Sequence, residues 1–105
     1  MKATPTNREE LHDLLVELLG NNHVYYEPPE TVKMKHPAIV YHKNHIANRY
    51  AGGTVYNKNY TYTVTLIDEN PDSEIIDKIL ELPFCKHNQN FTKDGMHHDV
   101  FTIKY

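Results

Sequence analysis

Histidine and cysteine side chains are the residues of this chain whose chemistry could support a metal site. His42 and His45 form an H-x-x-H pair, and Cys85 and His87 form a C-x-H pair. Zn²⁺ accepts imidazole and thiolate ligands, so these side chains could hold it if the fold brought them together. However, the first pair straddles the end of an expected strand, and C-x-H is not a usual zinc spacing. We therefore expect no metal and no cofactor, and a small metal-binding domain stays open as an alternative.

Two further groups of residues could in principle support catalysis. The run His97-His98-Asp99 contains the parts of a general-base arrangement, but neighbouring residues of an extended chain point to opposite faces and cannot converge. Cys85 with a distant histidine could form a nucleophile pair. A lone cysteine beside Phe84, after a helix-ending proline, is more often a small packed hydrophobic residue. We therefore expect no catalytic residues and a protein that is not an enzyme.

The glycine pair Gly52-Gly53 lies within residues 44–57, a segment whose pattern indicates irregular structure. It belongs to neither of the glycine motifs that cradle phosphates, G-x-G-x-x-G and G-x-x-x-x-G-K. Two interpretations remain open: a flexible loop tip, or a loop that becomes ordered against a neighbouring subunit. In the second interpretation the interface residues are the glycine pair and three large anchors, namely Ile46, Tyr50, Gly52, Gly53 and Tyr56.

Two helices are expected to hold these segments in place. The first has Thr6 and Glu9 as a capping box and ends at Gly20, and its apolar stripe is made by Leu11, Leu14, Leu15 and Leu18. The second is expected to begin with Asn70 as its N-cap and Pro71 at its first position, and to end at Pro83. Its apolar side is made by Ile75, Ile76, Ile79, Leu80 and Leu82.

Five segments are expected to be strands. Val24–Tyr26 should lie at a sheet edge, because Pro28 and Pro29 follow it and cannot donate ladder hydrogen bonds. The Tyr–Thr alternation of residues 60–66 is typical of a strand with one buried face. Residues 38–41, 84–87 and 100–105 complete the set, and Asp94-Gly95 marks a turn. The predicted fold is one α+β domain, residues 1–105, with a mainly antiparallel sheet of four or five strands and two helices packed on one face.

Composition excludes several classes of protein. The chain has 105 residues and a formal net charge of -3, and it has no basic stripe of the kind that grips a phosphate backbone. Its apolar runs are far shorter than the roughly 20 residues of a membrane helix, and its polar start is unlike a signal peptide. Cys85 is the single cysteine, which favours a reducing compartment. We expect a protein that is soluble and intracellular when made.

Four motifs of this chain, taken in order, resemble the motifs of a known protein family. They are Tyr25-Tyr26-Glu27-Pro28-Pro29, His36-Pro37-Ala38-Ile39-Val40-Tyr41, Asp68-x-x-Pro71-Asp72-Ser73-Glu74 and the ending Asp94-Gly95…His98-Asp99-Val100-Phe101. In order and spacing they are similar to the small tail-completion proteins of long-tailed bacteriophages, which are encoded with the head–tail joining genes. The resemblance covers about residues 7–105.

This resemblance implies a structural role in the virion neck. It implies a tail terminator, a homo-oligomeric ring, by family a hexamer, that stops growth of the tail tube. Its partners would be the tube protein and the head connector, and the protein would be made in the host cytoplasm and carried in the virion. Genome DNA would pass through the ring without specific binding. A strongly basic lining would hold the phosphates, and the net charge of -3 agrees with a channel that lacks one. Residues 44–57 would then lie at an interface or the lumen. A head-completion or stopper protein of the same neck is one alternative, and a host-interaction domain is another.

Overall fold

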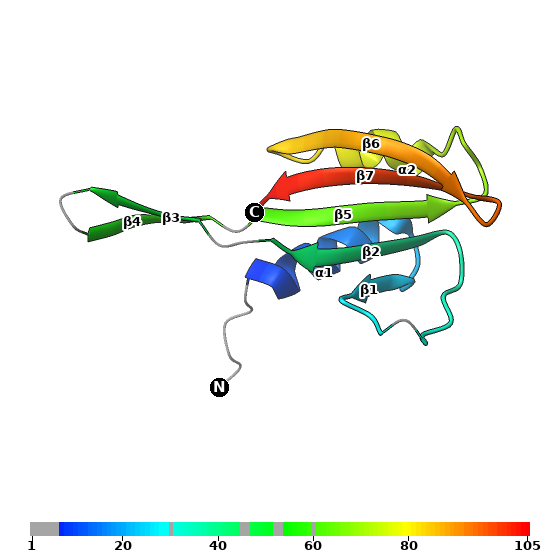
Figure 1. The fold of residues 1–105 in the computed structure, drawn as a ribbon, viewed down its shortest axis with the longest axis horizontal. Helices are drawn as coiled ribbons and strands as arrows, with labels where there is room; N and C mark the ends of the chain where they lie inside the picture. The colour runs from blue at the N-terminus through cyan, green and yellow to red at the C-terminus, as the bar shows by residue number, and fades with distance from the viewer. Residues whose placement is uncertain (1–6, 30, 45–46, 52–53, 60) are drawn as a thin grey trace.

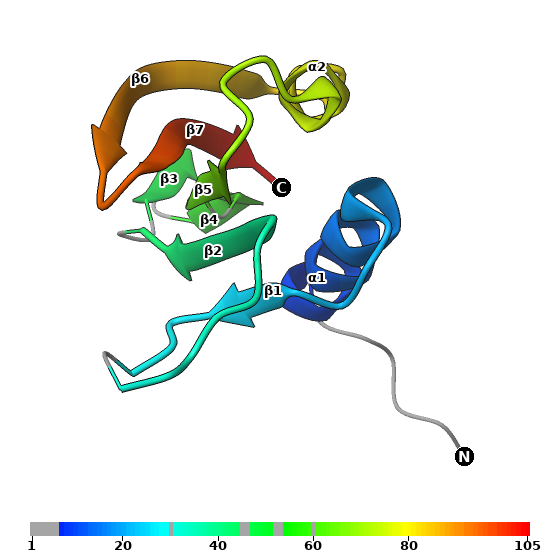
Figure 2. The same ribbon diagram turned by 90° about the vertical axis from the view of Figure 1, so that its right-hand side faces the viewer.

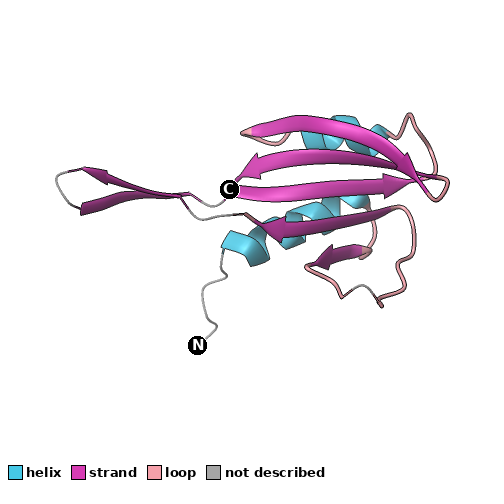
Figure 3. Ribbon diagram, in the orientation of Figure 1, coloured by secondary structure: helices cyan, strands magenta, loops and turns pink. Residues whose placement is uncertain are grey.

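The computed structural model describes residues 7–29, 31–44, 47–51, 54–59 and 61–105. For residues 7, 47–51 and 54–59 it describes the backbone alone. The chain forms two helices and seven strands within these ranges (Figures 1 and 3). In chain order they are α1 (Asn7–Leu19), β1 (Val24–Tyr26), β2 (Ala38–Lys43), β3 (Ala47–Ala51), β4 (Thr54–Asn59), β5 (Thr61–Asp68), α2 (Glu74–Leu80), β6 (Cys85–Lys93) and β7 (Met96–Lys104).

Five of these strands form one sheet in the order β1-β2-β5-β7-β6. All neighbours are antiparallel except β1 and β2, which run parallel with Tyr25 opposite Val40. The prediction of an α+β fold with a mainly antiparallel sheet is therefore confirmed, as is the edge position of β1. The sheet curves strongly from β1 to β6 (Figure 2).

The alternation expected in the Tyr–Thr strand is confirmed from Thr61 to Leu66, and Tyr60 lies outside the described residues. In β5 the side chains of Tyr62, Val64 and Leu66 are buried, whereas the threonines between them are partly exposed. In β7 the buried residues Phe101 and Ile103 follow the same alternation. These residues belong to one hydrophobic cluster that also contains Leu11 and Leu15 of α1 and Ile79 of α2. Both helices therefore contribute to a single core.

The helix α1 matches its apolar pattern. Leu11 and Leu15 of the predicted stripe are buried, and Leu14 and Leu18 are partly buried against the core; Leu19, which was not assigned to the stripe, is buried too. The helix ends at Gly20, whose φ of 82° suits glycine and whose N–H donates to the carbonyl oxygen of Val16 at 3.0 Å. The expected cap residue Thr6 lies outside the described residues.

The predicted start of α2 is wrong. Ser73, not Asn70, is the N-cap, and its Oγ accepts a hydrogen bond from the N–H of Ile75 at 3.3 Å. The side chain of Asn70 instead accepts from the N–H of Asp72 at 2.9 Å, and that of Asp68 accepts from the N–H of Asn70. These local hydrogen bonds stabilise two successive turns, so the helix begins at a later residue than predicted.

The last two strands are longer than predicted. They run over Cys85–Lys93 and Met96–Lys104, joined at Asp94 and Gly95, which have φ values of 54° and 77°. Positive φ at both residues suits the tight turn of a two-residue hairpin. Most of β6 is polar and exposed, so it lacks the apolar alternation by which a strand is found in a sequence.

The expected irregular region at residues 44–57 is wrong in part. Within it, β3 and β4 pair antiparallel as a separate two-stranded sheet, with Tyr50 opposite Val55 and an irregularity in the register between Arg49 and Tyr50. This hairpin projects away from the five-stranded sheet (Figure 1). The prediction of irregular structure rested on the glycine pair Gly52-Gly53, and the Asn and Ala residues of these strands are poor strand formers that gave no strand signal against it.

Replacing Leu15 with alanine should destabilise the fold by about 2–5 kcal/mol, because Leu15 is fully buried in the core. The matched control Asp13→Ala changes an exposed residue of the same helix and should alter the free energy of unfolding by less than about 0.5 kcal/mol. Urea unfolding followed by circular dichroism measures both values. Equal stabilities of the two variants would contradict the described core.

Candidate functional site

The histidines and the cysteine proposed as metal ligands are placed as follows. His42 is an exposed residue of β2, and His45 lies outside the described residues. Cys85 is partly buried at the start of β6 and packs against the core. Within the described ranges, no group of three or more His, Cys, Asp or Glu side chains is arranged to hold a metal ion.

The environment of Cys85 opposes a nucleophilic role. Burial raises the pKa of its thiol, because a charged thiolate would lose hydration there. A nucleophilic cysteine needs the opposite shift, since the thiolate is the reactive form. The surroundings of Cys85 therefore suit a packing residue.

The run His97-His98-Asp99 does not converge. The Nδ1 of His97 is 3.3 Å from the hydroxyl of Thr92, while the ring of His98 stacks on Phe91 with centroids 4.7 Å apart. Asp99 is buried and pairs instead with His87, whose Nε2 lies 3.1 Å from its carboxylate. Sequence reasoning missed this pair, because it depends on the register of β6 against β7.

A second polar cluster joins α1 to β1 and β2. The Nδ1 of His12 lies 2.6 Å from the hydroxyl of Tyr41, and the guanidinium of Arg8 lies 4.7 Å from the ring centroid of Tyr26. The rings of Tyr26 and Tyr41 are 5.0 Å apart. Burial raises the pKa of Tyr41, so its hydroxyl stays neutral and gives the core a polar attachment to α1. The cluster fixes the helix to the sheet.

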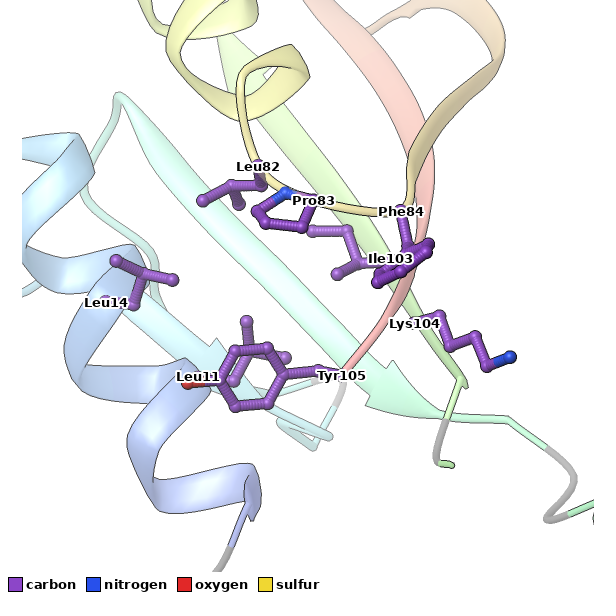
Figure 4. A pocket seen from close by; sticks show the side chains of 8 residues that line it. All are labelled: Leu11, Leu14, Leu82, Pro83, Phe84, Ile103, Lys104 and Tyr105. Carbon is purple, nitrogen blue, oxygen red and sulfur yellow. The ribbon is translucent and has the colours of Figure 1, made fainter. Parts of the chain in front are cut away.

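An apolar groove lies at one end of the sheet. It has a volume of about 350 Å³ and is lined mainly by Leu11 and Leu14 of α1, the Leu82-Pro83-Phe84 segment and the end of the chain around Ile103 and Tyr105 (Figure 4). Phe84 forms its rim and is 78% exposed. We call this hollow the helix groove.

The backbone at Phe84 is unusual. Its φ is 56°, in the left-handed region that bulky residues rarely adopt. Such a conformation costs roughly 1–3 kcal/mol and persists only where neighbouring structure holds it. Here the carbonyl oxygen of Phe84 accepts a hydrogen bond from the N–H of Lys104 at 3.2 Å, which ties the groove rim to β7. A strained backbone thus presents a large apolar side chain to solvent.

The predicted interface residues are only partly placed. Tyr50 lies in β3 and Tyr56 in β4, so both belong to the projecting hairpin. Ile46, Gly52 and Gly53 lie outside the described residues. The helix groove was not anticipated, because its residues come from three distant parts of the chain. Leu11, Leu14 and Leu82 were identified in the sequence only as residues of apolar helix faces, and nothing in the pattern indicated that they share a groove.

Charged residues are distributed unevenly between the region of the hairpin and the two helices. The stretch between Glu30 and Asp68 contains no acidic residue, and it carries Lys33, Lys35, Lys43, Arg49 and Lys58. The helices are acidic: against Arg8 and Lys78 they carry Glu9, Glu10, Asp13, Glu17, Glu74 and Asp77, and Glu81 follows α2 directly. The hairpin and the helix layer therefore have opposite charge.

The comparisons with known proteins give no assignment. No protein-family model matches this chain, and no curated protein is significantly similar to it. None of the described helices is long and apolar enough to cross a membrane.

The reactivity of Cys85 is directly measurable. Because its thiol pKa is raised, alkylation by iodoacetamide at pH 8 should be slower in the native protein than in the same protein unfolded in urea. The rate should rise with pH up to values above the ordinary thiol range. Faster alkylation of the native thiol would contradict a packing role and favour a nucleophile.

The variant Tyr41→Phe removes the hydroxyl that contacts His12 without changing the shape of the core. It should lower the free energy of unfolding by about 1 kcal/mol, the usual value of such a hydrogen bond. In the control Tyr25→Phe, the hydroxyl lost accepts only an exposed hydrogen bond from the N–H of Lys35. Urea unfolding compares the two variants. If both lost the same free energy of unfolding, the loss in Tyr41→Phe could not be assigned to the hydrogen bond with His12, and the attachment of α1 would not depend on it.

Proposed function

We propose that this chain is a structural protein of a bacteriophage neck, a tail terminator that caps the tail tube as a homo-oligomeric ring. The order of its four motifs supports the assignment by resemblance, and its surfaces support it by geometry. The observation that carries it is a projecting hairpin together with an apolar groove in one small domain. A closed ring of identical subunits needs two different surfaces of this kind, which meet head to tail.

The layout of the domain suits such a ring. We infer that both helices pack on the same face of the sheet, because Leu15 and Ile79 belong to one core cluster with Tyr62 and Phe101. The ribbons of both helices lie on the same side of the sheet in Figure 2. The opposite face, with the threonines of β5, would then be free to line a channel or contact the next layer of the neck.

The chemistry of the described side chains favours assembly over catalysis. The pKa of Cys85 is shifted away from nucleophilic use, and Asp99 and His87 satisfy each other. The exposed apolar rim at Phe84 is instead a surface that a partner could cover. We propose that the partners are further copies of the chain, the tube protein and the head connector, with DNA passing through.

A stopper protein in the same neck is the alternative that uses the same surfaces. Cryo-electron microscopy of virions distinguishes the two by position. A terminator forms a ring, expected to be a hexamer, directly on the last layer of the tail tube, whereas a stopper lies on the connector side. Absence of this chain from the neck would overturn both and leave a monomeric host-interaction domain as the better explanation.

Deleting residues 50–53 should impair ring assembly, because it removes the end of the hairpin. The deletion should leave the melting temperature of the subunit nearly unchanged, since β3 and β4 form a sheet separate from the five-stranded one. As a control, replacing Asp94 by asparagine changes the turn between β6 and β7 and should preserve assembly. Sedimentation velocity and thermal unfolding give the two readouts. A ring that forms normally after the deletion would refute a role for this hairpin.

A further inference from the structure

We propose that the β3–β4 hairpin of one subunit docks in the helix groove of the next copy of the chain. The inference deepens the proposed ring by naming its two contacting surfaces, and it rests on that function only in taking the partner to be a second copy. Four observations carry it: the isolation of the hairpin, the apolar groove, the pairing of Tyr50 with Val55, and the opposite charges of the two features.

The hairpin needs support that its own subunit does not supply through the sheet. β3 and β4 form a two-stranded sheet separate from the five-stranded one. An isolated two-stranded hairpin is at best marginally stable in water and becomes stable when it packs on another surface. Figure 1 shows the hairpin directed away from the rest of its subunit, so a neighbouring molecule is the natural source of that surface.

The helix groove lies near the base of the hairpin. Thr61, the first residue of β5 and close to the end of β4, pairs with Lys104 at the groove. Figure 4 shows the side chains of Leu11, Leu14 and Tyr105 on one side of the groove and those of Pro83 and Phe84 on the other. The hairpin extends outward from this end of the molecule, while the groove is hollowed into it. The two features are thus a projection and a recess, as head-to-tail contact requires.

The outer part of the hairpin has residues suited to an apolar recess. Its register places Tyr50 opposite Val55, next to the last pair, Ala51 and Thr54. Opposite residues of an antiparallel pair lie on the same face, so an aromatic and a branched residue occupy neighbouring positions near the tip. Aromatic anchors in apolar pockets dominate the energy of many interfaces. The exposed Phe84 would gain a partner in the same contact.

Charge gives the contact its direction. Arg49 and Lys58 are the charged residues of β3 and β4. The helices α1 and α2 beside the groove are mainly acidic, and the groove itself is lined by one basic residue, Lys104. Opposite charges on two surfaces steer their association and disfavour contact between like surfaces. Hairpin-to-hairpin and helix-to-helix contacts between copies are therefore disfavoured, and contact between the hairpin and the helices that border the groove is favoured.

Disulfide trapping tests the contact in the full-length chain. In a Cys85→Ser background, one variant carries Phe84→Cys at the groove and a second carries Thr54→Cys near the hairpin tip. The two are mixed under mild oxidation, and covalent dimers are counted by non-reducing electrophoresis and mass spectrometry. The control replaces Phe84→Cys by Lys93→Cys, at the β6–β7 turn, at the opposite end of β7 from the groove. Disulfides form only between Cα atoms within about 7 Å, so the reaction reports the docking geometry.

The proposal predicts at least about a tenfold higher yield of mixed dimer for the groove variant than for the Lys93→Cys control. Equal yields would overturn it, and so would a chain that remains monomeric at every concentration tested. A neck ring seen in virions without this disulfide would refute the docking mode and leave the proposed function standing. Trapping without a neck ring would refute the proposed function and leave the contact.

A pair of substitutions gives an independent readout. Phe84→Asp puts a carboxylate at the groove rim and should weaken self-association about tenfold or more, whereas Phe91→Asp alters another exposed phenylalanine, away from the groove, and should not. Raising the salt concentration should also weaken association, because salt screens the attraction between opposite charges. A hairpin that binds duplex DNA, with association unaffected by Phe84→Asp, would assign the basic hairpin to nucleic acid instead.

Discussion

The architecture depends on a single hydrophobic core between the sheet and the two helices. Tyr41, Tyr62 and Phe101, its largest fully buried side chains, lie on three neighbouring strands and pack with the leucines of α1 and with Ile79 of α2. A chain of this length buries enough apolar surface for one such core and little more. The hairpin forms a sheet separate from the one that builds this core, and Phe84 is 78% exposed. A partner would explain both features, because it could stabilise the hairpin and cover the side chain of Phe84.

The elements that face this core were predictable from sequence, and those that do not face it were not. The leucine period of α1 and the Tyr–Thr alternation of β5 follow directly from burial of one face. By contrast, β6 is polar over most of its length and is a strand because it pairs with β7. The start of α2 was misplaced because Asn70 and Ser73 are both good caps, and the turn hydrogen bonds of Asn70 decide between them.

The candidate site was only partly accessible to sequence reasoning. Tyr50 and Tyr56 were identified as interface residues by type, but their place on a hairpin depends on pairing between strands of weak propensity. The helix groove unites α1, the end of α2 and the end of β7, and such proximity exists only in the folded chain. The buried pair of Asp99 and His87 likewise arises from strand register. The sequence pattern thus identifies candidate residues, but the tertiary contacts of the folded chain determine which of them lie together.

Hydrogen exchange of the hairpin amides tests most directly whether the hairpin is stabilised by a neighbouring subunit. The amides of β3 and β4 would be compared between dilute monomer and assembled protein, with β5 and β7 as the internal reference. The account predicts little protection of the hairpin in the monomer and strong protection in the assembly, while the reference strands stay protected in both. Strong protection of the hairpin in the monomer, or no gain in protection on assembly, would contradict it.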